Sequence, residues 1–97
     1  MTINVERDFE LVTLEITGRL DTTTAPNLET TVKELSEDIK ELVFDMSELE
    51  YISSAGIRVL RGADKKMSSN NGIMRIEKAN ETVREVFEMT GLLQMLD

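Results

Sequence analysis

Two adjacent serines, Ser53 and Ser54, are the side chains whose type and position most clearly suggest chemistry. They directly precede a segment whose apolar residues recur at helical spacing, at Ile57, Leu60, Ala63 and Met67. The first N–H groups of a helix lack partners and the dipole is positive there, so a serine can cap the helix and an added phosphate is tolerated. Ser54 is therefore either an ordinary helix cap or a phosphorylatable hydroxyl, and spacing alone does not separate the two.

Asp21 and Asp45 each follow an apolar strand segment, and we expect both to lie at the same sheet edge as Ser54. Each either serves its own turn or contributes to a site at the serines. No activating base, glycine-rich phosphate loop or metal-ligand cluster accompanies them. The chain also has no cysteine and no histidine. Histidine is the commonest general base and the commonest metal ligand. A serine hydrolase is excluded, and we expect no catalytic residue, no metal and no cofactor.

Three basic residues, Arg58, Arg61 and Lys65, are spaced three and four apart on the helix predicted after the serines. They form either an ordinary solvated face or a stripe that docks a partner. The formal net charge of −8 argues against binding nucleic acid or anionic membrane. We therefore expect a protein partner. The chain lacks a membrane-length apolar stretch and a signal peptide, so we expect a cytoplasmic location.

The first half of the chain predicts two antiparallel strands, a helix and a central strand. Alternating apolar residues at Ile3 and Val5, and again from Phe9 to Thr17, indicate the strand pair. A helix should begin near Thr24, with its apolar face formed by Leu28, Val32, Leu35 and Ile39. The uninterrupted apolar run from Leu42 to Phe44 is typical of a central strand covered on both faces.

The second half predicts the helix after the serines, a strand and a last helix. The helix should end near Ser68 to Gly72, and the strand should span Ile73 to Glu77. Asn80 should cap the last helix, and Gly91 should end it before a closing turn. We expect that helix to bury Val83, Val86 and Phe87, the closing turn to contain Leu92, Leu93, Met95 and Leu96, and the core to include Met67, Met74 and Met89. The order β-β-α-β-α-β-α predicts one α/β domain over residues 1–97 with a mixed sheet.

Four segments carry a more specific pattern, in this order along the chain. They are Gly18-Arg19-Leu20-Asp21 with Thr24 and Ala25, then Asp45-Met46-Ser47, then Tyr51-Ile52-Ser53-Ser54-Ala55-Gly56-Ile57, and finally Val86-Phe87-Glu88-Met89-Thr90-Gly91-Leu92. Together they resemble the signature of STAS domains, specifically the bacterial anti-sigma factor antagonists. The resemblance implies the STAS fold and places Ser54 at the family's phosphorylated serine. It also implies that Asp21 lies close to the phosphoserine loop.

The resemblance implies a partner switch that regulates sigma-factor-dependent transcription. In this interpretation the unphosphorylated chain binds an anti-sigma factor that is also a serine kinase with its own bound ATP. Phosphorylation of Ser54 ends the association, and a PP2C-type phosphatase restores it. The predicted partner-binding residues are Asp21, Thr24, Ser53, Ser54, Gly56, Arg58 and Arg61.

Ser53 departs from the family pattern, because many phosphorylated members carry Asp directly before the modified serine. It removes a carboxylate and adds a second hydroxyl. Ser53 is therefore an alternate phosphorylation site. The same departure favours a second function, a non-phosphorylated STAS scaffold or a module that senses a small ligand such as a nucleotide.

Overall fold

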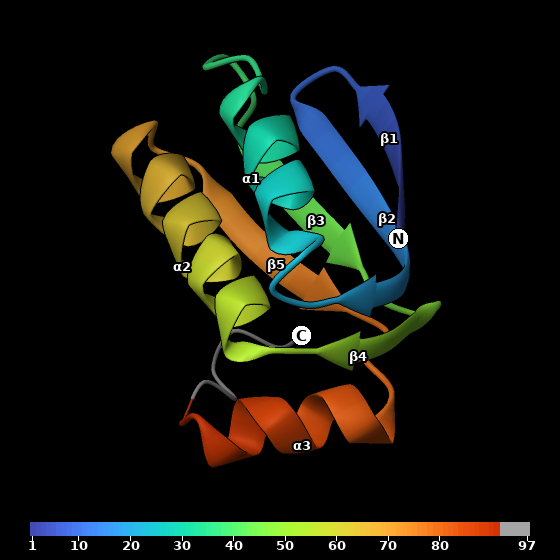
Figure 1. The fold of residues 1–97 in the computed structure, drawn as a ribbon. Helices are drawn as coiled ribbons and strands as arrows, with labels where there is room; N and C mark the ends of the chain where they lie inside the picture. The colour runs from blue at the N-terminus through green and yellow to red at the C-terminus, as the bar shows by residue number, and fades with distance from the viewer. Residues whose placement is uncertain (92–97) are drawn as a thin grey trace.

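The structure is a computed structural model, and it describes residues 1–91. One sheet contains β1 (Thr2–Asp8), β2 (Leu11–Leu20), β3 (Glu41–Asp45) and β5 (Ile73–Glu77), side by side in the order β1-β2-β3-β5. The helices α1 (Ala25–Lys33) and α2 (Ser54–Ser69) lie against one face of this sheet, and α3 (Glu81–Met89) crosses its end (Figure 1). β1 runs antiparallel to β2, whereas β3 runs parallel to both β2 and β5. The predicted α/β class with a mixed sheet is confirmed.

The segment between β3 and α2 contains a fifth strand, β4 (Leu49–Ile52), in a region where no strand is predicted from the sequence. β4 runs parallel to the last residues of β2, and a shift in register between Gly18 and Arg19 accompanies the change of partner. Gly18 has a φ of 95°, a conformation that glycine adopts without strain. β2 is therefore long enough to pair with β3 first and with β4 afterwards.

The central strand β3 is buried from Leu42 to Phe44, as its apolar run predicts. Leu42 and Phe44 belong to the core beneath α1 and α2. Val43 points to the other face, where no helix within residues 1–91 packs (Figure 1). It is nevertheless only 4% exposed, between its register neighbours Thr13 and Arg75. The expectation that this strand is covered on both faces is confirmed, because Leu42, Val43 and Phe44 are all buried, although within residues 1–91 helices pack on one face only.

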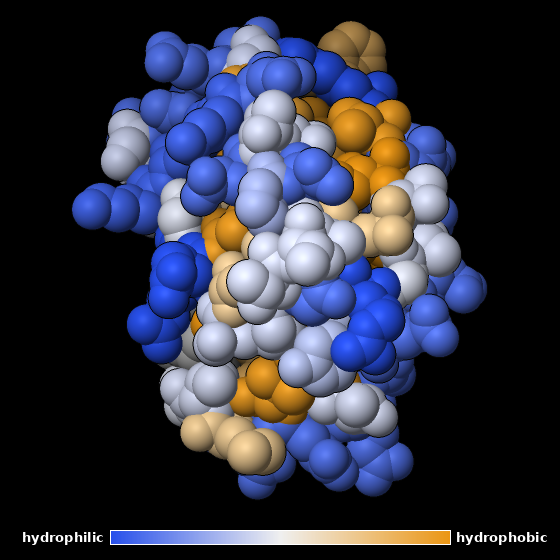
Figure 2. All heavy atoms as spheres, in the orientation of Figure 1, coloured by the Kyte–Doolittle hydropathy of each residue, from blue (hydrophilic) through white to orange (hydrophobic). Residues whose placement is uncertain are grey.

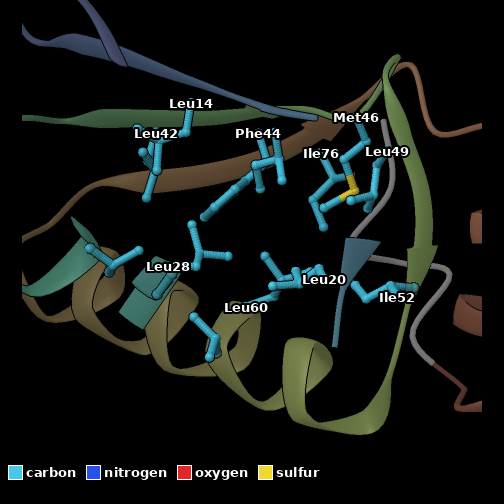
Figure 3. Packing of buried hydrophobic residues seen from close by; sticks show 14 of the residues in the cluster. Leu14, Leu20, Leu28, Leu42, Phe44, Met46, Leu49, Ile52, Leu60 and Ile76 are labelled. Carbon is cyan, nitrogen blue, oxygen red and sulfur yellow. The ribbon is translucent and has the colours of Figure 1, made fainter. Parts of the chain in front are cut away.

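The core consists of branched aliphatic, methionine and phenylalanine side chains from the sheet and the helices. Side chains of the sheet, such as Leu14 and Phe44, point toward Leu28 of α1 and Leu60 of α2 (Figure 3). Among the described residues no polar or charged side chain is buried in this core. The outer face that carries α1 and α2 is mostly polar, with separate apolar patches (Figure 2). None of the helices in residues 1–91 is long and apolar enough to cross a membrane.

The first helix is shorter than predicted, because α1 ends at Lys33. Ile39 is still fully buried, but it reaches the core from the loop that leads to β3. The ammonium group of Lys66 donates to the carbonyl oxygens of Val32 (2.8 Å) and Leu35 (3.1 Å) at the end of this helix. Apolar spacing therefore indicated burial correctly and the length of the helix incorrectly.

The last helix begins as predicted. The side-chain oxygen of Asn80 accepts a hydrogen bond from the backbone N–H of Val83 (2.9 Å), and its amide nitrogen donates to the carbonyl oxygen of Leu49 in β4 (2.7 Å). Gly91 follows with a φ of 72°, which ends the helix. The residues expected to form a closing turn, Leu92, Leu93, Met95 and Leu96, lie outside the described residues.

The three methionines that we expected in the core have different outcomes. Met67 is buried, and Met74 is half-buried against the core. Met89 is 85% exposed at the end of α3, so its predicted burial is wrong. The helical pattern fixes the inward face through Val83 and Phe87, and Met89 falls outside it.

Candidate functional site

Two loops meet where β2 and β4 end side by side. In the parallel pairing Leu20 lies opposite Ile52, and the backbone N–H of Ser53 donates to the carbonyl oxygen of Leu20 (2.9 Å). β2 continues from Leu20 into the turn before α1, and β4 continues from Ile52 into the start of α2 (Figure 1). This pairing brings the Asp21 turn next to the two serines.

The two serines at the start of α2 have different environments. Ser53 is the N-cap residue: its backbone is extended, and its hydroxyl oxygen accepts a long hydrogen bond from the N–H of Gly56 (3.5 Å). Ser54 is the first residue of the helix and is exposed. Within residues 1–91 the Ser54 hydroxyl has no hydrogen-bond partner. The capping role therefore falls to Ser53, and the Ser54 hydroxyl is accessible.

Gly56 allows the start of α2 to lie directly on the strands. A Cβ atom at this position would lie 2.7 Å from Cγ of Leu20 and 2.9 Å from Cγ1 of Ile52, which is closer than carbon atoms approach. Gly56 is buried, and its lack of a side chain lets the start of α2 lie against Leu20 and Ile52; its contact with a partner stays a prediction.

Asp21 holds the turn that begins α1. One of its carboxylate oxygens accepts hydrogen bonds from the Thr23 hydroxyl (2.8 Å), the Thr23 N–H (3.0 Å) and the Thr24 N–H (3.1 Å). The Thr24 hydroxyl donates in turn to the carbonyl oxygen of Arg19 (2.8 Å). The hydrogen bond from the Thr23 hydroxyl is the largest influence on this carboxyl and lowers its pKa below the ordinary value. Asp21 is therefore adjacent to the serines and already engaged by its own turn.

Asp45 lies elsewhere, so the expectation that it shares an edge with Ser54 is wrong. It pairs with Glu15, five residues before β2 ends at Leu20, which is roughly 17 Å along the strand. Its carboxylate accepts from the N–H of Ser47 (3.0 Å) and lies 3.6 Å from the ammonium group of Lys78. Burial raises the pKa of Asp45, but the hydrogen bonds from Ser47 and the charge of Lys78 outweigh it and leave that pKa below the ordinary value.

The predicted basic stripe is exposed along α2. Arg58, Arg61 and Lys65 all lie at the surface, and none of them forms an ion pair with another described residue. A surface hollow joins part of the stripe to the serine; among the described residues its lining is Ser54, Ile57, Arg58, Arg61 and Thr90. The stripe is thus continuous with the accessible hydroxyl.

Thr90 is the polar lining residue that was not among the site residues predicted from the sequence. It belongs to the C-terminal segment that carried part of the family resemblance, but no local pattern places the end of α3 beside the start of α2. Its hydroxyl donates to the carbonyl oxygens of Val86 (2.9 Å) and Phe87 (3.2 Å) in its own helix. In the described part of the chain no group of acidic side chains is arranged to hold a metal ion.

Comparison with known proteins identifies consistent relatives. The model of the STAS domain family matches residues 2–97. The anti-sigma-B factor antagonist of Bacillus subtilis (strain 168) is 25% identical over 97 residues, which cover 100% of this chain and 89% of the relative. An anti-sigma factor antagonist structure from Mycobacterium paratuberculosis is 26% identical, with a TM-score of 0.85 over 98% of this chain and 81% of that one. The Bacillus cell fate determinant SpoIIAA in its phosphorylated form has the same fold, with a TM-score of 0.79 at 17% identity over 99% of this chain and 89% of that one.

Proposed function

Because the chain belongs to the STAS domain family and is similar to its anti-sigma factor antagonists, we propose that it is a phosphorylation-controlled partner switch. The unphosphorylated chain binds an anti-sigma factor that is also an ATP-dependent serine kinase, and this binding frees the sigma factor. Phosphorylation of Ser54 ends the association, and a PP2C-type phosphatase resets it. The observation that carries this proposal is the exposed hydroxyl of Ser54 at the first position of α2.

The different environments of the two serines support Ser54 as the residue that is phosphorylated. Ser53 is half-buried, and its oxygen accepts the capping hydrogen bond, so phosphorylating it would disrupt the start of α2. Ser54 can be modified without loss of that cap. A phosphate there also lies at the positive end of the helix dipole. The fold should therefore survive the modification.

The same phosphate would act strongly across an interface. It adds about −1.5 to −2 charges to a surface that must be desolvated when the partner binds. Like charge placed opposite it can cost several kcal/mol. Control of binding by Ser54 thus needs no change in the fold of the chain.

Phosphopeptide mapping tests this proposal. The purified chain is incubated with Mg-ATP and an extract of its own source cells, and the peptides over residues 41–75 are analysed by mass spectrometry. We expect phosphate on Ser54 in the native chain and in Ser53→Ala, and no phosphate in Ser54→Ala. Phosphate on Ser53 alone would assign the switch to the alternate site.

Ser53 in place of the aspartate that precedes the modified serine in many relatives favours a second candidate function. In that case the chain is a non-phosphorylated scaffold, or a module that senses a small ligand such as a nucleotide. Neither serine would then be modified, while a known kinase substrate added to the same extract would be. That result would contradict the partner switch and support the second candidate.

A further inference from the structure

Arg58 and Arg61 are placed on the same side of α2 as Ser54. They follow it by four and seven residues, about one and two helical turns, and all three side chains line the same hollow. Side chains on a helix lean toward its N-terminus, so both arginines lean toward Ser54. We propose that a phosphate on Ser54 is bound within the same chain by the guanidinium groups of Arg58 and Arg61. This inference rests on the proposed function, because it concerns the phosphorylated form.

The two guanidinium groups are available for this role. Arg58 and Arg61 are exposed and form no ion pair with another residue in the described range. Glu29 lines a second hollow, between α1 and α2, together with Arg58, but the ion-pair partner of its carboxylate is Lys33 (3.5 Å). The Thr90 hydroxyl, on the other wall of the hollow, already donates to carbonyl oxygens of α3. Among the described side chains that line this hollow, the arginines are therefore the donors that a phosphate would meet.

Arginine suits this ligand chemically. Its planar guanidinium group presents several N–H donors and binds phosphate oxygens in pairs. A phosphoserine carries about −1.5 to −2 charges, which two arginines balance. Phosphorylation would therefore add an anion and also neutralise two positive charges of the stripe that faces the partner. The switch would act by masking the docking charges as well as by repulsion.

Titration of the phosphate by ³¹P NMR tests this inference without a kinase. Phosphoserine is incorporated at position 54 of the full chain during synthesis, and the second pKa of its phosphate, ordinarily about 6, is measured at low ionic strength. Nearby positive charge favours the dianion. We expect that pKa to be at least about half a unit lower in the chain with both arginines than in Arg58→Gln/Arg61→Gln. Lys65→Gln is the matched control, because it removes one charge three turns from Ser54 and should leave the pKa unchanged.

The outcomes separate this inference from the proposed function. Equal phosphate pKa values with and without the arginines would overturn the inference, and so would an equal rise in Lys65→Gln. If the phosphorylated chain in that case still fails to bind the kinase, the partner switch stands and acts by repulsion alone. If the arginines lower the pKa but phosphorylation leaves binding unchanged, the phosphate is bound within the chain and the proposed switch fails.

Discussion

The two ends of α2 use their polar side chains in opposite ways. In the N-terminal half of α2, called the first end below, the Ser54 hydroxyl and the guanidinium groups of Arg58 and Arg61 have no hydrogen-bond or ion-pair partner among the described residues. Toward the other end the ammonium group of Lys66 donates to three carbonyl oxygens at the end of α1. Polar groups with internal partners hold the fold together, whereas polar groups that face solvent without partners remain available to other molecules. From this contrast we predict that the first end serves binding and that Lys66, toward the second end, serves stability.

The largest expected effect is on partner binding at the first end. Ser54→Ala should bind the anti-sigma factor kinase constitutively, because it keeps a neutral surface and cannot be phosphorylated. Ser54→Asp should bind at least roughly a hundredfold more weakly, because the added carboxylate must be desolvated against a surface that fits a hydroxyl. Isothermal titration calorimetry with the purified kinase measures both affinities. Similar affinities for the two variants would remove the binding role from this end of α2.

The second prediction concerns stability at the other end. Lys66→Met keeps most of the aliphatic length but leaves the carbonyl oxygens at the end of α1 without their charged donor. We expect the free energy of unfolding to fall by about 1.5–3 kcal/mol, measured from the midpoint of urea denaturation. Lys65→Met is the matched control, because Lys65 is the adjacent residue and is exposed. It should change stability by less than about 0.5 kcal/mol. Equal losses in the two variants would show that Lys66 has no special role.

The features predicted correctly from the sequence depend on local signals. The strand Ile73–Glu77 has the predicted bounds, since a turn signal precedes it and most of its residues are apolar. Asn80 caps the last helix, because a side-chain acceptor three residues before the bonded N–H is a local arrangement. The start of α2 at the two serines follows from the same chemistry. The sequence alone does not show which serine caps the helix, because the answer depends on the residue at which β4 ends and α2 begins.

The features that sequence did not predict depend on distant parts of the chain. β4 has four residues, too few for a period to be recognised, and it exists because β2 extends beyond β3. Because β2 extends beyond β3, Asp45 lies far from the serines and Asp21 lies near them, although each of these aspartates follows an apolar strand segment. Ile39 is buried although it lies in a loop. A spacing of three or four residues indicates that a side chain faces inward, but it does not show that the residue belongs to a helix. The place of Thr90 beside Ser54 depends on how α3 crosses the end of the sheet.

The smallest expected effect on stability is that of substituting Asp21. This residue also tests the comparison between the two ends of α2, because it lies beside the serines yet has hydrogen-bond partners in its own turn. Its pKa in the folded chain is lowered, chiefly by the Thr23 hydroxyl. It therefore stabilises the fold above the pKa of an unfolded Asp, about 3.9, and this stabilisation is lost as the pH falls through the lower folded value. Asp21→Asn should be less stable than the native chain at neutral pH, and the difference should shrink in acid. Urea denaturation at several pH values between about 6 and 2 measures this difference.

Two further measurements show whether Asp21 contributes to stability alone, as we expect of Lys66, or also to partner binding. Thr23→Val removes the hydroxyl that most lowers the pKa of Asp21, so it should reproduce part of the acid-dependent difference while leaving the carboxylate in place. Asp21 is among the partner-binding residues predicted from the sequence. One of its carboxylate oxygens, however, already has its hydrogen bonds within residues 21–24, so we expect both variants to bind the kinase as the native chain does. Weaker binding by Asp21→Asn alone would mean that the carboxylate also contacts the partner. In that case a polar group with internal partners can serve binding as well, and the presence of such partners would no longer distinguish the two ends of α2.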